Sequence, residues 1–257
     1  MVGVVISELP IGSIVRFGRY QLGHMTCTTD INWIKVSKDN HFISEKVLIG
    51  AAFDAYESNW RTNNDYSLSN IRQYMNSDAE RWYMPTHQHD KEMGYIFYND
   101  TGYTVNTSRY KGLLNHFTDA ELSAFEHHES GDILRLPTKR EIDGGFQYFI
   151  HRGRKAHAVD EYGSLERKEY FSGMFSAYYV LDEMQRVPDG EVCEVTRSGQ
   201  FRNIWPHVYS GVRPVCKIKA DREVISVGEN TYEMNLSSAT PVKYFEETQS
   251  LDWLLGL

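Results

Sequence analysis

The sequence predicts an α+β fold built from short strands and a few short helices. Three observations lead to this prediction: segments with alternating apolar and polar residues recur at both ends of the chain, helix-start patterns occur in its middle, and aromatic residues make up 13% of it. Alternation over a few residues is typical of strands that are buried on one face. Tyrosine, which occurs 17 times, packs its ring in such cores while its hydroxyl stays in water.

The first fifty residues predict a meander of strands joined by polar turns. Ser13–Phe17 alternates apolar and polar residues and ends at Gly18, and Ile31–Val36 repeats the alternation. Asp39–Asn40 is a turn sequence, after which residues 41–49 continue in an extended conformation.

The middle of the chain carries signs of a short helix and of a long loop. Ser67 or Ser69 can cap a helix whose apolar residues recur at helical spacing. Residues 81–112 are interrupted by one proline and three glycines. We expect them to form a long loop, which in a compact domain is often functional.

Two capping boxes follow. In a capping box, a threonine and a glutamate three residues later satisfy free backbone N–H groups at the start of a helix. The pairs are Thr118 with Glu121 and Thr138 with Glu141. Between them, residues 132–136 predict a strand that Pro137 ends.

The last third is again rich in strands. They are predicted at residues 175–181, 191–196, 201–205 and 212–218, with a hairpin turn at Ser198–Gly199. We therefore expect one domain over residues 1–235 and a C-terminal extension over residues 236–257. Its apolar end, residues 250–257, is expected to dock on the core or on a partner.

Composition argues against several classes of protein. The formal net charge is -8 and no run of Lys and Arg occurs, which argues against nucleic-acid binding, because a binder has to neutralise phosphates. No apolar stretch is long enough to span a membrane. The N-terminus lacks the basic region and the cleavage site of a signal peptide.

The cysteines and histidines indicate which metal sites the chain could form. Cys27, Cys193 and Cys216 are odd in number and form no C-x-x-C pair, which argues against a disulfide framework and a zinc finger. His87 and His89 form a His-x-His pair that puts both rings on one face of a strand, so they are candidate metal ligands. The alternative is a solvated loop, and we expect no cofactor.

Residues 135–142 (RLPTKREI) resemble a segment of the formylglycine-generating-enzyme group, whose fold is C-type-lectin-like. Residues 211–215 (GVRPV) resemble that group's G-F-R motif, and residues 197–202 (RSGQFR) stand where it has R-G-G-S-W. The resemblance implies short twisted antiparallel sheets with two or three short helices. It also implies structural roles for Arg135, Pro137, Thr138, Glu141, Gly211 and Arg213.

The whole chain also resembles an uncharacterised domain of phage-encoded and bacterial surface proteins. The matching segments are FGRY at 17–20, INW at 31–33, SNW at 58–60 and SNIRQYMN at 69–76. This resemblance implies a phage-encoded protein located in the virion or in the host cytoplasm.

The resemblance to the formylglycine-generating-enzyme group also implies which residues bind a partner. In diversity-generating relatives the ligand surface precedes the final G-x-R motif, which implies partner-binding residues here: Arg202, Asn203, Trp205, His207 and Tyr209. Trp, Tyr and Arg are typical of binding hot spots, although Trp205 and Tyr209 could instead be core residues.

The first hypothesis is therefore a non-catalytic recognition or structural module that binds another protein or a surface glycan. The second is a phage-encoded inhibitor that binds a host defence protein. The third is a copper oxidase of the formylglycine-generating type, whose paired cysteines hold copper(I). Against the third, Cys193 and Cys216 are spaced more widely than the family's pair, and residues 170–186 lack its G-N-V-W-E-W segment. No complete catalytic motif such as G-x-S-x-G occurs, so we expect no catalytic residues.

Overall fold

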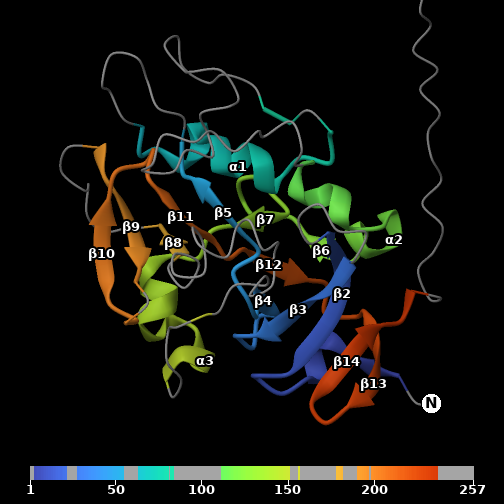
Figure 1. Cartoon of the computed structure of the whole chain (residues 1–257). Helices are drawn as coiled ribbons and strands as arrows, with labels where there is room; N and C mark the ends of the chain where they lie inside the picture. Colours follow the sequence, from blue (N-terminus) through green and yellow to red (C-terminus); the bar gives the residue numbers. More distant parts are fainter. Residues whose placement is uncertain are drawn as a thin grey trace, which may run out of the picture.

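The computed structural model describes residues 3–21, 28–54, 63–80, 82–83, 111–150, 156, 178–181, 190–196 and 198–236. Within these ranges the chain is a mixed α+β protein that consists mostly of sheet, with a few short helices (Figure 1). The α+β prediction is therefore confirmed. None of the helices in the described part of the chain is long and apolar enough to cross a membrane.

The larger sheet lies at the right of Figure 1 and follows the order β1-β13-β14-β2-β3-β4-β12-β6, with β7 also pairing with β12. Its strands are β1 (Val4–Val5), β2 (Ile14–Gln21), β3 (Thr28–Lys35), β4 (His41–Ser44), β6 (Phe125–Glu126), β7 (Leu134–Arg135), β12 (Val215–Ile218), β13 (Glu223–Gly228) and β14 (Thr231–Met234). Neighbours are antiparallel except β14 and β2, which are parallel.

The smaller sheet, at the left of Figure 1, follows the order β10-β9-β8-β11-β5. Its strands are β5 (Ile49–Ala52), β8 (Tyr178–Val180), β9 (Val192–Val195), β10 (Phe201–Ile204) and β11 (Tyr209–Val212). β11 and β8 are parallel and the other described pairs are antiparallel. The prediction of antiparallel sheets thus holds for most strand pairs in the two sheets.

The helices are short, and α1 and α2 begin where the capping patterns predict. They are η1 (Ile6–Glu8), η2 (Tyr66–Leu68), α1 (Asn70–Met75), η5 (Leu113–His116), α2 (Asp119–Leu122), η6 (Glu141–Gly145) and α3 (Gln147–Ile150). The Ser69 side chain accepts a hydrogen bond from the Arg72 N–H and so caps α1. At α2 both bonds of the capping box between Thr118 and Glu121 are present.

Two of the places where the chain passes from one sheet to the other lie side by side. β4 leads to β5 and β11 leads to β12, and the two crossings are bonded together: Ser44 N–H donates to the Pro214 carbonyl at 3.0 Å, and Leu48 N–H to the Val212 carbonyl at 2.9 Å. The prediction of one strand over residues 212–218 is wrong, because Arg213–Pro214 separates two strands of different sheets. Proline has no N–H to continue a ladder, so a change of sheet is favourable there.

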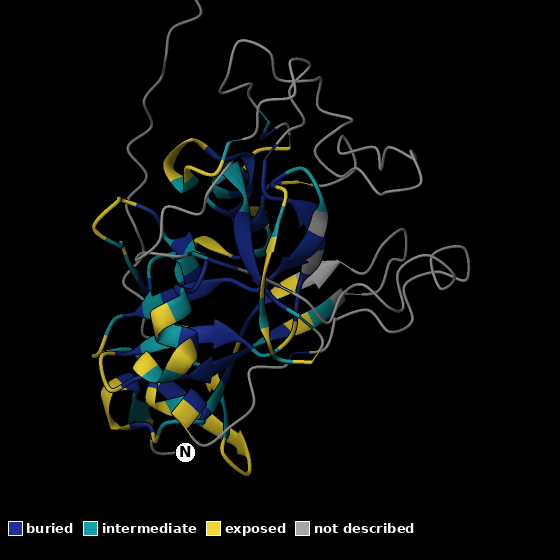
Figure 2. Cartoon of the chain, turned by 90° about the vertical axis from the view of Figure 1, so that its left-hand side faces the viewer, coloured by how far each residue is buried: buried dark blue, intermediate teal, exposed yellow. Residues whose placement is uncertain are grey.

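Buried residues form two apolar clusters. Figure 2 shows buried residues on the strands in the interior and exposed residues on outer turns, helices and strand faces. The first cluster centres on four aromatic rings. Phe17 stacks on Trp33 with ring centroids 5.2 Å apart, and Phe17 and Phe117 each meet Phe125 edge-on. The second cluster lies around α3 and η6 and includes Ile43, Val215 and Cys193.

Two further differences from prediction concern strands. The predicted strand end at Gly18 is wrong, because β2 continues to Gln21 through a register shift between Arg16 and Arg19. Gly18 has a φ of +73°, which a residue without a Cβ adopts at little cost. The hairpin of β13 and β14 was not predicted. Residues 84–110 of the expected loop and residues 237–257 of the expected extension lie outside the described residues.

Candidate functional site

A tight turn after β10 holds Trp205 at the surface. Val208 N–H donates to the Trp205 carbonyl at 2.9 Å, and Phe53 and Asp54 N–H groups at the end of β5 donate to the Pro206 carbonyl at 2.8 and 3.1 Å. The Trp205 residue is 45% exposed and its ring stacks on that of His207, with centroids 6.5 Å apart. The alternative that Trp205 is a core residue is therefore wrong, and its backbone is fixed by neighbouring strands.

Arg202 and Asn203 lie on β10, an outer strand of the smaller sheet, and both are exposed. Arg202 has a second role. Its guanidinium donates from Nε to Oε1 of Glu194 at 3.0 Å and also bonds that oxygen through Nη2. Because the Glu194 side chain is only 1% exposed, Arg202 compensates a buried carboxylate on β9.

Tyr209 is separated from these residues in the sheet. It begins β11, and β9 and β8 lie between β10 and β11. At the usual spacing of about 4.8 Å between strands, β11 is about 14 Å from β10. The turn brings Trp205 and His207 together beside the end of β10, whereas Tyr209 starts a more central strand.

The residues around Pro137 make a bonded unit. The Arg135 guanidinium donates hydrogen bonds to both carboxylate oxygens of Glu141, from Nη1 at 2.8 Å and from Nη2 at 2.5 Å. Thr138 N–H donates to Glu141 at 2.8 Å and Glu141 N–H to the Thr138 hydroxyl at 3.2 Å. Burial would raise the pKa of Glu141, but the bonds from Arg135 and Thr138 hold that pKa below its ordinary value. Pro137 accepts a bond from Leu181 N–H at 2.8 Å, so this unit joins a helix start to the end of β8.

Arg213 lies at the crossing between the sheets and is 2% exposed, directly after Gly211–Val212 at the end of β11. Its Nε donates to the Ser44 carbonyl at 2.9 Å and its Nη2 to the Glu45 carbonyl at 3.4 Å. The guanidinium carbon also lies 5.8 Å from the ring centroid of Phe149. These contacts give Arg213 a structural role.

No candidate metal centre is found in the part of the chain that is described. Across those ranges, no three His, Cys, Asp or Glu side chains are close enough together to hold a metal ion. His87 and His89 lie outside the described residues. Cys193 and Cys216 are free thiols, buried in the second and the first apolar cluster respectively.

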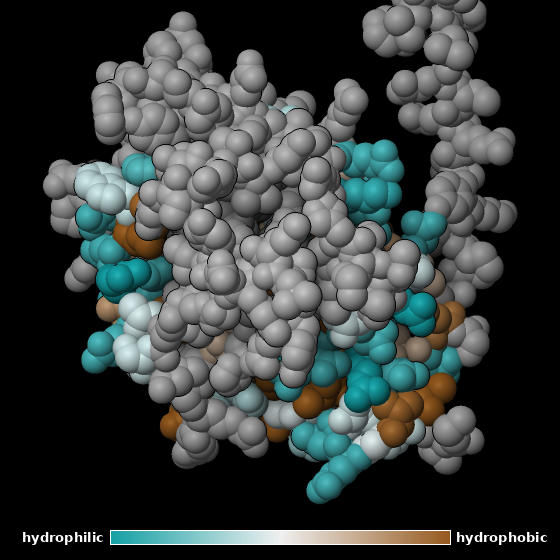
Figure 3. All heavy atoms as spheres, viewed as in Figure 1, coloured by the Kyte–Doolittle hydropathy of each residue, from teal (hydrophilic) through white to brown (hydrophobic). Residues whose placement is uncertain are grey.

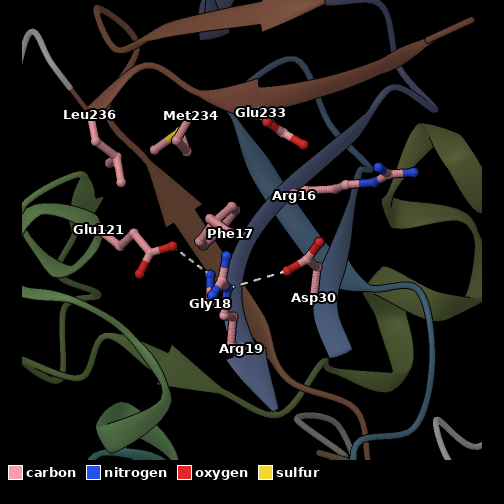
Figure 4. A pocket seen from close by; sticks show the side chains of 9 residues that line it. All are labelled: Arg16, Phe17, Gly18, Arg19, Asp30, Glu121, Glu233, Met234 and Leu236. Atoms are coloured by element: carbon pink, nitrogen blue, oxygen red, sulfur yellow. Dashed lines mark hydrogen bonds and ion pairs between the residues drawn. The ribbon is translucent and has the colours of Figure 1, made fainter. Parts of the chain in front are cut away.

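A small pocket lies on the larger sheet, away from β10. It has a volume of about 190 Å³, below the roughly 300 Å³ at which pockets for small-molecule ligands begin. Figure 4 shows Phe17, Met234 and Leu236 pointing toward one another, and Arg19 pairing with Asp30 at 3.6 Å. The pocket is too small for a typical metabolite.

Glu194, which bonds Arg202 on β10, is a residue beside the predicted binding residues that the sequence analysis did not identify. A carboxylate inside the otherwise apolar segment VCEV, directly opposite Arg202 in the hairpin register, was the available signal.

The Arg202–Glu194 pair yields a prediction. Arg202→Ala is expected to lower the free energy of unfolding by about 1–3 kcal/mol, because it leaves a buried carboxylate uncompensated. Adding Glu194→Gln should restore most of this loss. Urea unfolding of both single variants and the double variant measures the coupling, and equal losses in the single and double variants would contradict it.

Comparison of the chain with models of protein families, with curated proteins and with solved structures found no match.

Proposed function

We propose that this chain is a non-catalytic binding module whose contact surface comprises Trp205, His207, Arg202 and Asn203. The partner is another protein. The two sheets with their short helices support the C-type-lectin-like interpretation, in which a stiff framework presents such a surface.

The exposure of Trp205 carries the proposal. A tryptophan that is 45% exposed leaves a large apolar area in water, and Trp and Arg are the residues that most often dominate protein interfaces. The turn that holds it is bonded to the end of β5, so little conformational entropy is lost when a partner covers the ring. Exposed Arg202 and Asn203 add polar groups at the rim.

Trp205→Ala is expected to weaken partner binding at least tenfold while leaving the melting temperature within about 2 °C of the unsubstituted protein, since truncating a hot-spot tryptophan costs about 2 kcal/mol or more. Val227→Ala is a matched control. Val227 on β13 is also 45% exposed, and apolar residues gather over that hairpin in Figure 3.

A photoreactive amino acid at position 203 identifies the partner, with the same group at position 227 as the reference. Cross-linking to host lysate and to purified virions separates a host target from a virion component. The affinity of the purified partner for each variant is then measured by calorimetry. If Trp205→Ala binds as tightly as Val227→Ala, this surface is not the contact site.

A further inference from the structure

Six titratable side chains gather on one face of the larger sheet. They are His41 on β4, Glu126 on β6, His128 after β6, Arg135 on β7, Glu141 on η6 and Lys217 on β12. Lys217 pairs with Glu126 at 2.6 Å, and Arg135 pairs with Glu141. Each permanent cation thus has its own carboxylate, and the two histidines lie between the pairs with no carboxylate bonded to either in the described part of the chain.

The two histidine rings lie face to face. Their centroids are 6.3 Å apart and their planes differ by 14°. His41 also meets the Phe146 ring at 5.6 Å, and its Nδ1 lies 3.1 Å from the Ser37 hydroxyl. The backbone of Val215 on β12 lies close enough to His128 to raise its pKa slightly. The Nε2 of His128 is buried and has no hydrogen-bond partner among the described residues.

A proton on His128 Nε2 would be placed among positive charges. Burial, Arg135 and His41 together lower the pKa of His128 to about 4, against smaller opposing effects of Val215 and Glu141. For His41, burial, Arg135 and Lys217 lower the pKa, while Glu141 and Asp39 oppose them. Both rings are therefore held neutral in the folded protein.

His128 also anchors an exposed turn between β6 and β7. Its N–H donates to the Asp132 carbonyl at 2.8 Å, and Gly131 N–H donates to the His128 carbonyl at 2.8 Å. Residues 129–131 are exposed, whereas Asp132 at the far end of the turn is buried and pairs with Arg72 at 2.8 Å. The His128 ring is therefore the side chain that packs inward at the near end of the turn. We propose that His41 and His128 form an acid-sensitive latch, which holds residues 127–131 against β4 and β12 and releases them when His128 takes up a proton.

The direction of the pH effect follows from linkage. A histidine whose pKa is lower in the folded state stabilises that state fully above about pH 6.5, and this contribution is lost as the pH falls toward about 4. The equilibrium for opening the turn is expected to rise about 10- to 20-fold between pH 7 and pH 5, the lower figure allowing for partial solvent access.

Hydrogen exchange on the full chain tests the latch. Protection factors of the His128 and Gly131 amides, corrected for the intrinsic pH dependence of exchange, are expected to fall over this pH range in the unsubstituted protein. His128→Asn keeps a polar side chain at this position but cannot be protonated, so its protection should stay constant. His127→Asn is the matched control: His127 is the exposed neighbour whose Nδ1 lies 2.8 Å from the Gly131 carbonyl, and this variant should still lose protection.

Equal pH dependence in His128→Asn and His127→Asn would overturn the proposal. An NMR titration of the histidine rings in the unsubstituted protein gives an independent result that does not depend on how a variant folds. A His128 ring that titrates near its ordinary pKa of 6.5 would also overturn it.

Discussion

Gly18→Ala is expected to lower the free energy of unfolding by about 2–4 kcal/mol, through backbone strain at positive φ and through overpacking. The φ of Gly18 is +73°, and a Cβ there would lie 2.5 Å from Cε1 of Phe117. Phe117 packs against Phe17, Trp33 and Phe125, so its ring has little room to move. The Gly18 N–H also donates to Glu121 Oε1 at 2.7 Å, and a backbone shift would weaken that buried bond.

The variant Gly131→Ala separates the cost of backbone strain from the cost of overpacking. Gly131 has a φ of +82°, but a Cβ added there would meet no described atom within 4 Å, so only the conformational cost of about 1 kcal/mol remains. Thermal unfolding should show a drop in melting temperature of about 5–15 °C for Gly18→Ala and a few degrees for Gly131→Ala. Equal drops would mean that the contact with Phe117 carries no cost.

Arg213→Met is expected to destabilise the protein by about 2–4 kcal/mol, because the buried carbonyl of Ser44 loses its donor at 2.9 Å. Methionine fills part of the volume, and the loss of a buried charge offsets some of the cost. The remaining penalty reflects the bonds that Arg213 makes at the crossing between the sheets and its position beside Phe149.

Arg213→Lys should fall between Arg213→Met and the unsubstituted protein, because an ammonium group has the charge but not the planar fork that reaches both Ser44 and Glu45. Arg16→Met, at an exposed position on β2, is the control and should change stability by less than about 0.5 kcal/mol. Urea unfolding measures all three. An Arg213→Met protein as stable as the Arg16→Met protein would contradict the structural role of Arg213.

The local features of the fold were predictable from the sequence. Ser69, Thr118 and Thr138 cap helix starts because a side-chain oxygen and nearby backbone N–H groups are all that the motif requires. Ser198–Gly199 turns as predicted, with Gly199 at a φ of +83°. These contacts join residues that are close in sequence, so their types and spacing carry the information.

Contacts between distant segments were not predictable in the same way. The continuation of β2 beyond Gly18 depends on Glu121, which lies 103 residues away and accepts the Gly18 N–H. The separation of β11 from β12 depends on the bonds that Arg213 and Pro214 make with the β4 region. Apolar alternation does not specify which strands pair, so neither the two parallel pairings nor the order of the sheets followed from it.

In the candidate site, too, some residues were predictable from the sequence and others depended on contacts between distant segments. The resemblance to a lectin-like framework pointed to Trp205 and His207, and the structure places their rings together. Glu194 was missed because a buried carboxylate is recognised by its partner, Arg202, which only the hairpin register brings opposite to it. The sequence also did not indicate that His128, which follows β6, would meet His41 of β4.

The paired crossing of the chain between the sheets has a consequence for synthesis on the ribosome. β5 is translated early, but its partner β11 follows more than 150 residues later, with Tyr209 opposite Ala52. At about 5–20 residues per second, the nascent β5 waits roughly 10–30 s for that partner. The backbone groups of β5 that bond β11 lack that partner for this time, so slower elongation lengthens the exposure of this strand edge and favours aggregation of the emerging chain.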